Sequence, residues 1–278
     1  MRAAIAAAAA VSSAAASLPS PLVMPWLCLE RCGDSASTIS AEVAQFSAHR
    51  ELNWASFEMY NLGPGSTLIK NNLTAVAAPL RAAGAATVAM VSSYPYPTNF
   101  VATMREVFAA PQPFIDAVIA ACEREGLSGV NIDWEPPSNA NPKATHADAL
   151  AYAAFLDTLA AALQAHSPPL IASVDVATWS PIWDLQAIAA TRVDAIFFMG
   201  TYTEGFALWQ KVLAEAVADV GLEKLVVGLE TTKATSGGPY NASELTLRFD
   251  ALRAAGVRRV GLWDAPVPEL WFPFLQAL

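Results

Sequence analysis

The chain has 278 residues, of which 54% are hydrophobic and 15% are charged, and its formal net charge at pH 7 is −9. This length fits one large domain or two small ones, and the hydrophobic content can supply a large core. The negative charge argues against nucleic acid or an anionic membrane surface as a partner, because phosphate groups would be repelled.

The N-terminal segment has the pattern of a secretory signal peptide. Arg2 supplies a positive charge, residues 3–16 are small and apolar, and small residues that offer a cleavage site follow. The run is too short and too poor in leucine to span a bilayer. We expect a signal peptide over residues 1–20 and one domain over residues 21–278, exported to the extracellular space or to the lumen of the secretory or lysosomal route. An alanine-rich tail on a cytosolic protein is the alternative.

Cysteines and glycosylation triplets agree with export. Cys28 and Cys32 are close enough in sequence to form a disulfide bond in an oxidising compartment, and Cys122 is expected to be a buried helical thiol. Two N-glycosylation sequons begin at Asn72 and Asn241. The three histidines fall in helix-like or loop segments and are expected on the surface, so no metal site or cofactor is expected.

Strand-like and helix-like segments alternate from residue 22 to the C-terminus. The expected strands are residues 22–29, 53–60, 87–94, 129–135, 170–176, 195–202, 225–230 and 259–264. The expected helices are residues 41–50, 73–83, 113–124, 146–165, 181–190, 206–218, 243–255 and a short piece at 270–278. Ser243 with Glu244 is expected to open one helix, and Gly126 and Gly256 to follow the ends of two others. Eight such repeats predict an α/β fold, a single-domain (β/α)8 TIM barrel. The competing doubly wound sheet would show a glycine-rich phosphate loop after its first strand, and none is present.

The segment Gly-Val-Asn-Ile-Asp-Trp-Glu-Pro-Pro, residues 129–137, is the most informative in the chain. Apolar residues alternate with Asn131, Asp133 and Glu135, which is the period of a strand. A buried strand rarely carries two carboxylates on one face, because each costs several kcal/mol to desolvate. A catalytic strand is the interpretation we favour, and a wet edge strand or an internal salt bridge is the alternative.

Acidic and aromatic residues recur at the C-terminal ends of the expected strands, where TIM barrels place their active sites. They are Glu58, Asp133, Glu135, Asp175, Tyr202, Glu230, Trp263 and Asp264. Carboxyl groups can act on glycosidic oxygens and aromatic rings pack on sugar faces, so this end predicts a carbohydrate site.

Asp133 and Glu135 are expected to share a hydrogen bond or a proton. Residues two apart on a strand are about 6–7 Å apart at Cα. Burial and the like charge of Asp133 are expected to raise the pKa of Glu135 by about two units, which makes Glu135 a proton donor at neutral pH. The hypothesis requires that both carboxyl groups face the cavity and that neither is paired beneath an arginine.

This segment resembles the fourth barrel strand of glycoside hydrolase family 18, the chitinases and their relatives, whose motif is Asp-x-x-Asp-x-Asp-x-Glu. Ser128, Asn131, Asp133 and Glu135 occupy the four motif positions, so the last two acids match and the first two are replaced. Chitobiase-like members are similar in having Asn-x-Asp-x-Glu. Residues 198–202, 224–229 and 256–263 resemble the sixth, seventh and eighth strands, although Thr203 replaces the usual Asp and residues 91–94 lack the third-strand Ser-x-Gly-Gly.

The resemblance implies a retaining, substrate-assisted hydrolase of β-1,4-linked N-acetylglucosamine polymers or oligomers, such as chitin or the N-glycan core. Glu135 would protonate the leaving oxygen and then activate water, while the 2-acetamido carbonyl attacks the anomeric carbon. Asp133 would hold the acetamido nitrogen, Tyr202 would hydrogen-bond the acetamido oxygen, and Trp263 would form the floor. Further substrate contacts are expected from Asn131, Glu58, Asp175, Glu230 and Asp264. A monomer without cofactor, nucleic-acid partner or membrane insertion is expected.

Two other functions stay open. Glu135 and Glu230 end the fourth and seventh expected strands, where other retaining barrel glycosidases carry their acid/base and nucleophile. A chitinase-like lectin would bind amino sugars without cleaving them; the replaced motif acids favour it, whereas the presence of Glu135 speaks against it. Because no long insertion separates the later strands, a shallow, open site is expected.

Overall fold

The computed structural model describes residues 18–233 and 235–278, so residues 1–17 of the expected signal peptide lie outside the described residues. Eight parallel strands form a ring in the order β1-β9-β8-β7-β6-β5-β4-β2, and pairing of β1 with β2 closes it. The barrel strands are β1 (Leu22–Leu27), β2 (Trp54–Gly63), β4 (Ala86–Ser92), β5 (Gly129–Asp133), β6 (Ile171–Val176), β7 (Ala195–Phe198), β8 (Leu225–Glu230) and β9 (Arg259–Trp263). The predicted TIM barrel is confirmed.

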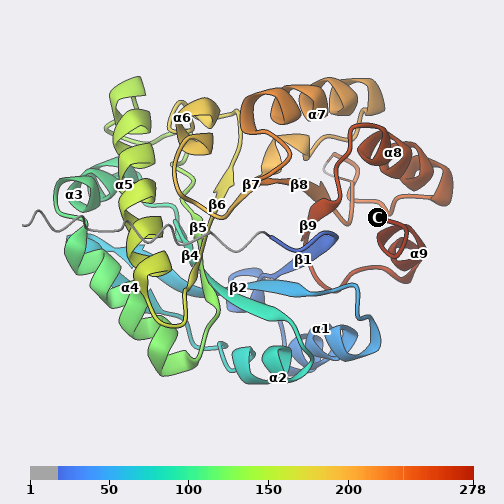
Figure 1. The fold of residues 1–278 in the computed structure, drawn as a ribbon, viewed down its shortest axis with the longest axis horizontal. Coiled ribbons are helices and arrows are strands. Elements are labelled where there is room, and N and C mark those ends of the chain that lie inside the picture. The colour runs from blue at the N-terminus through green and yellow to red at the C-terminus, as the bar shows by residue number, and fades with distance from the viewer. Residues whose placement is uncertain (1–17, 234) are drawn as a thin grey trace, which may run out of the picture.

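Helices cover the outside of the barrel (Figure 1). They are α1 (Ala36–Ala48), α2 (Ala77–Ala82), α3 (Phe100–Ala109), α4 (Gln112–Glu125), α5 (His146–Ala165), α6 (Leu185–Ala189), α7 (Phe206–Val220), α8 (Ala242–Ala254) and α9 (Phe272–Leu275). Within the described residues, no helix is both long enough and apolar enough to cross a bilayer.

Several local features differ from the predictions. Helix α3 and the short strand β3 (Thr67–Lys70), which pairs antiparallel with β2, were not predicted. Helix α8 begins after Asn241, not at Ser243: the Asn241 side chain accepts from the backbone N–H of Glu244, whose carboxylate accepts from the backbone N–H of Asn241 in return. The expected sixth strand is shorter, because β7 ends at Phe198 and a 3-10 turn, Met199–Thr201, leads to Tyr202.

The alternation of side chains separates two apolar cores. On β1, Leu22, Met24 and Trp26 point into the barrel, whereas Val23 and Leu27 pack outward under the helices. The interior cluster consists of Leu22, Met24, Trp26, Trp54, Val88, Met90, Ala195, Phe197 and Val226. It is a packed plug, so any ligand site has to lie above it at the mouth.

Candidate active site

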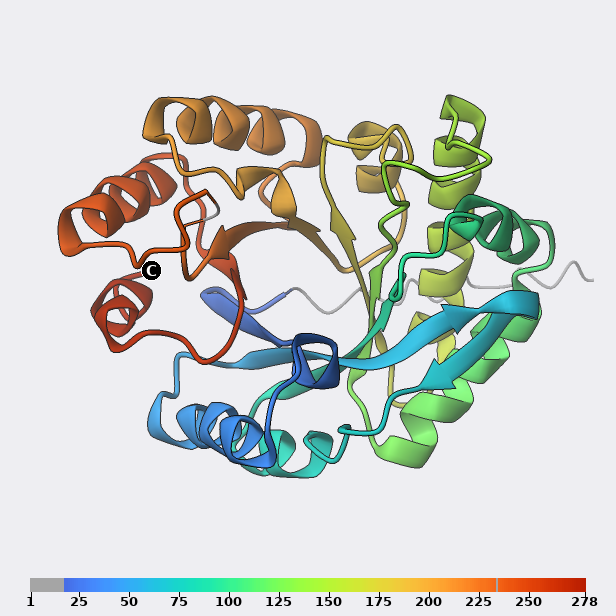
Figure 2. The same cartoon turned by 180° about the vertical axis from the view of Figure 1, so that it is seen from behind.

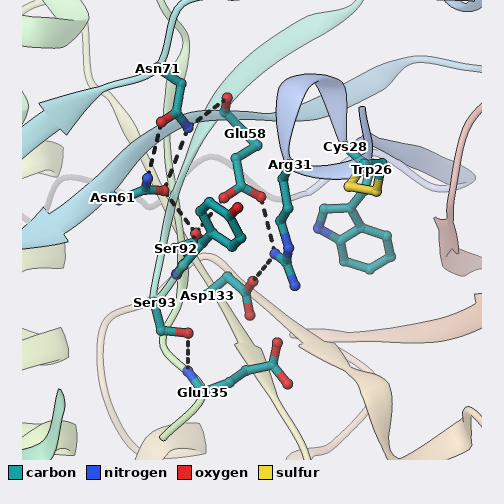
Figure 3. Close-up of polar contacts among 12 residues, drawn as sticks. Trp26, Cys28, Arg31, Glu58, Asn61, Asn71, Ser92, Ser93, Asp133 and Glu135 are labelled. Atoms are coloured by element: carbon teal, nitrogen blue, oxygen red, sulfur yellow. Dashed lines mark hydrogen bonds and ion pairs between the residues drawn. A yellow bond between two sulfur atoms is a disulfide. The ribbon is translucent and has the colours of Figure 1, made fainter. Parts of the chain in front are cut away.

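The acidic strand β5 has the orientation that its alternation predicts. Val130, Ile132 and Trp134 belong to the outer core, and the Trp134 ring stacks on Phe155 of α5 at 5.2 Å. The opposite face therefore directs Asn131 and Asp133 into the barrel. The strand ends at Asp133, two residues earlier than expected, and the backbone N–H of Glu135 donates to the Ser93 hydroxyl at 3.0 Å (Figure 3).

Asp133 and Glu135 have raised pKa values, as a buried acid pair should. Burial raises the pKa of Glu135, and the charge of Arg31 opposes this effect. Burial also raises the pKa of Asp133, and the negative charges of Glu135 and Asp175 add to it. The like charge that raises the pKa of Glu135 is that of Glu58 and not, as expected, that of Asp133, whose hydrogen bond with Glu135 lowers it. Both pKa values are raised, and the two carboxyl groups lie close enough to influence each other's ionisation.

Arg31 is the unexpected residue of the site. It lies in the 3-10 turn Leu29–Cys32 that follows β1, drawn dark blue in Figure 2. Its Nη1 donates to Glu58 Oε2 at 3.0 Å and lies 3.5 Å from Asp133 Oδ2 (Figure 3). The expectation that neither acid pairs with an arginine is therefore wrong for Asp133. The ion pair involves only Oδ2, however, so Oδ1 stays unpaired among the described residues and both acids still line the pocket. Arg31 has no ion pair with Glu135 within the part of the chain that the structure describes.

Asn131 does not reach the mouth of the barrel. Its Nδ2 donates to Asp175 Oδ1 at 2.9 Å and to the Ser173 hydroxyl, and its Oδ1 accepts from Ser56 and from the Trp26 indole. The side chain is completely buried. Asn131 thus holds Asp175 in place, and the motif position that carries an acid in the resembling family is here occupied by a structural amide.

Tyr202 enters the site because a glycine on the next strand leaves room for its ring. A Cβ on Gly228 of β8 would lie 2.9 Å from Tyr202 Cε1 and 2.8 Å from the Phe198 carbonyl. Burial among the acids raises the pKa of Tyr202 well above its ordinary value, so its hydroxyl stays protonated and can donate a hydrogen bond.

Two tryptophans form an aromatic wall. Trp263 at the end of β9 lies 6.4 Å from Trp26 between ring centroids, and both line the pocket. A Cβ on Gly261 would lie 2.4 Å from the Trp26 ring, so β9 needs its glycine here. Trp263 and Glu230 are neighbours across the β8–β9 pairing.

These residues surround a pocket of about 260 Å³ at the C-terminal end of the barrel. Of the residues predicted from sequence, the structure brings six to its wall: Asp133, Glu135, Asp175, Tyr202, Glu230 and Trp263. Glu58, Asn131 and Asp264 do not line it, and Glu58 is instead buried beneath Arg31. The volume is below the usual 300–1,000 Å³ of ligand pockets and fits a site for about one sugar ring.

Three buried polar atoms of wall residues find no hydrogen-bond partner among the described residues. They are Asp133 Oδ1, the Tyr202 hydroxyl and Glu230 Oε2. An unpaired buried polar group costs about 1–3 kcal/mol, so a ligand that paired with these atoms would recover this free energy. One neutral hydroxyl and two carboxyl oxygens predict a ligand that offers both hydrogen-bond donors and an acceptor.

Sequence reasoning missed six wall residues: Trp26, Arg31, Met90, Tyr96, Trp179 and Met199. Trp26 could have been found, because it is the last inward residue of β1 by the alternation used for the other strands. Arg31, Tyr96 and Trp179 lie in loops, where no periodic pattern indicates which way a side chain points.

The chain matches a known family over more than half of its length. Residues 71–231 match the family described as "Glycosyl hydrolases family 18". This segment includes Asp133, Glu135 and Tyr202 but neither Arg31 nor Trp263. Compared by sequence with curated proteins, the chain has no match.

Solved structures with the same fold are distant in sequence. The spore cortex-lytic enzyme SleL of Bacillus cereus is 13% identical with a TM-score of 0.76, over 93% of this chain and 74% of that chain. A chitinase from Chromobacterium violaceum is 14% identical with a TM-score of 0.73, over 92% and 98%. A class V chitinase from Pseudomonas fluorescens is 16% identical with a TM-score of 0.72, over 93% and 99%. At these identities the likeness shows the fold alone.

Proposed function

This chain belongs to glycosyl hydrolases family 18, and we propose that it cleaves β-1,4-linked N-acetylglucosamine polymers or oligomers by substrate-assisted, retaining catalysis. Membership makes it a chitinase-like glycosidase with a carbohydrate substrate. The substrate, the mechanism and the roles of individual residues are the proposal.

The unpaired atoms of Asp133 and Tyr202 are the observation that carries this proposal. A 2-acetamido group has one N–H donor and one carbonyl acceptor, and the pocket offers an acceptor on Asp133 and a donor on Tyr202. A sugar with a plain 2-hydroxyl has neither an amide N–H for Asp133 nor a carbonyl oxygen for the Tyr202 hydroxyl. Both atoms are buried, so each hydrogen bond would form away from competing water.

The reaction needs a proton on Glu135 and a negative charge on Asp133. When the acetamido N–H binds Asp133 Oδ1, it favours the ionised form of Asp133, and the proton shared by the pair stays on Glu135. Glu135 then gives this proton to the glycosidic oxygen as the acetamido oxygen bonds to the anomeric carbon and the leaving sugar departs. Asp133 stabilises the positive oxazolinium ion, and Glu135, now ionised, takes a proton from the water that opens it.

Glu230 supports a second candidate mechanism. It lines the pocket with an unpaired buried oxygen and could act as the nucleophile of a covalent displacement with Glu135 as acid/base. Burial raises the pKa of Glu230, and Asp264 and Glu204 add to this effect, which opposes the ionised form that a nucleophile needs. We therefore rank the substrate-assisted mechanism first.

Turnover of a chromogenic chitobioside tests the proposal, with Glu135→Gln and Glu230→Gln as variants and the matching cellobioside as control. We expect hydrolysis of the chitobioside only, lost in Glu135→Gln and retained in Glu230→Gln. Hydrolysis of both substrates together with loss in Glu230→Gln would establish the covalent mechanism. Binding of chitobiose to the wild-type protein without any turnover would establish a lectin.

We also propose that the protein is exported. The structure contains the Cys28–Cys32 disulfide, which fits an oxidising compartment. Asn72 and Asn241, the sequon asparagines, are both exposed. Secretion from a eukaryotic host, with a mass change after glycosidase treatment that is lost in Asn72→Gln and Asn241→Gln, tests export and glycosylation together.

A further inference from the structure

Arg31 occupies the centre of the site although its turn lies outside the segment that matches the family. We propose that Arg31 is a positioning residue for the acid pair: it holds Asp133 by Oδ2, which leaves Oδ1 free for the substrate, and it places a positive charge beside the two carboxyl groups. The disulfide Cys28–Cys32 fixes the turn that delivers it. The inference rests on the function proposed above and extends it to a residue and a loop that the motif does not contain.

The contacts of Arg31 define a fixed geometry. The guanidinium bridges Glu58 and Asp133, donates to the Tyr96 hydroxyl, and lies over the rings of Tyr96 and Trp263 at 5.1 and 5.5 Å from their centroids. Its side chain is 15% exposed. Because it contacts two carboxylates and two rings and is largely buried, the guanidinium is restrained near the acid pair.

Arg31, and not Asn131, is the side chain that contacts Asp133 Oδ2. The amide of Asn131 is fully used by Ser173, Asp175, Ser56 and Trp26, and it makes no hydrogen bond to Asp133 in the described chain. Arg31 is the one cation that pairs with Oδ2 of Asp133 among the described residues, so it restrains the orientation of this oxygen. A free Asp133 could turn its second oxygen away from the pocket and leave no acceptor for an acetamido N–H.

The charges around the pair explain why a cation is needed. Facing Asp133 from the neighbouring strands and loops are Glu58 of β2, Glu135 after β5, Asp175 of β6 and Arg31. Arg31 is the only cation among the described residues that line the pocket. Without it, burial and repulsion would keep both members of the pair protonated to higher pH, and a neutral Asp133 would be a weaker hydrogen-bond acceptor and could not stabilise an oxazolinium ion by charge.

The disulfide restricts the position of Arg31. Cys28 and Cys32 bracket a turn of three residues, and the side chain of Leu29 within it is completely buried. A turn closed at both ends and anchored by a core leucine limits the movement of the arginine that it carries. Loss of the disulfide bond should therefore weaken the influence of Arg31 on the ionisation of the acid pair. In a protein that lacks Arg31, loss of the disulfide bond should not change this ionisation.

Titration of the acid pair by NMR, with 13C-labelled Asp and Glu side-chain carboxyl groups, tests this without needing turnover. Asp133→Asn and Glu135→Gln assign the resonances. In Arg31→Gln we expect the first ionisation of the pair to move up by about one pH unit, and in Arg31→Lys to move by much less. Arg192→Gln, which removes an exposed ion pair with Asp157, is the control and should leave it unchanged.

The double variant Cys28→Ser/Cys32→Ser should also move the first ionisation of the pair to higher pH. When combined with Arg31→Gln, it should cause no further shift of this ionisation. If the chitobioside is hydrolysed, the acidic limb of the kcat/KM profile should shift with the NMR value, and kcat should fall about 10-fold to 100-fold in Arg31→Gln with little change in KM. An unchanged ionisation in a folded Arg31→Gln protein overturns the inference. A shifted ionisation without any turnover in the wild type leaves the role of Arg31 standing and overturns the proposed function.

Discussion

Replacement of Tyr202 by Phe is expected to stabilise the folded protein and to weaken catalysis. The Tyr202 hydroxyl is buried and finds no partner in the described structure, so the free protein gains nothing from it and bears its desolvation cost. Removing an unsatisfied buried hydroxyl should increase the free energy of unfolding by about 1 kcal/mol. For a chain of this size, that corresponds to a rise in Tm of about 2–4 °C.

In the complex the same hydroxyl is expected to donate to the acetamido carbonyl. Its loss leaves a buried acceptor unpaired, which costs about 1–3 kcal/mol, and each 1.4 kcal/mol is about tenfold. We therefore expect kcat/KM for a chitobioside to fall by about 10-fold to 100-fold. The opposite signs of the two effects distinguish a ligand-binding hydroxyl from a structural one.

Chemical denaturation and initial-rate kinetics of the two proteins measure both effects. Tyr152→Phe is the matched control, because the Tyr152 hydroxyl is also buried and unpaired among the described residues but does not line the pocket. It should show the gain in stability without the loss of activity. A Tyr202→Phe protein that is destabilised by more than about 1 kcal/mol, or that is fully active, would refute the reasoning.

Three further predictions concern other parts of the chain. Burial raises the pKa of Glu42 to about 7 from an ordinary 4.5, so the stability that its neutral form contributes is complete below pH 4.5 and is lost as the pH rises through 7. Glu42→Gln should remove up to about 3 kcal/mol of this pH dependence, measured by denaturation from pH 4 to 8. Gly228→Ala should push the Tyr202 ring out of place, lower kcat/KM about as much as Tyr202→Phe and cost about 1–3 kcal/mol of stability, and unchanged kinetics would show that the ring tolerates the methyl group. Trp179 is 55% exposed and lines both the pocket and an adjoining hollow of about 310 Å³. Trp179→Ala should therefore raise KM up to about tenfold for longer oligosaccharides but not for a chitobioside. An equal rise in KM for the two kinds of substrate would place the contact of Trp179 inside the main pocket.

Local patterns in the sequence were sufficient for the barrel and for part of its site. Alternation with a period of two assigns Asp133 to the interior and Trp134 to the outer core wherever the strand lies, because successive side chains must point to opposite faces. The end of the eighth strand was predicted to place Trp263 with Asp264 at the mouth, and the structure places only Trp263 in the pocket wall. The short spacing of Cys28 and Cys32 made their disulfide bond a reasonable expectation.

Contacts between distant segments decided the rest. Closure of the barrel brings the turn after β1 beside β5, and so puts Arg31 on Asp133, although 102 positions separate them in the sequence printed above. The partners of Asn131 depend on the register of β5 against β6, which no single strand encodes. Periodicity states which face of its own segment a residue occupies, whereas the charge partners of a buried acid depend on which other segments pack against that face.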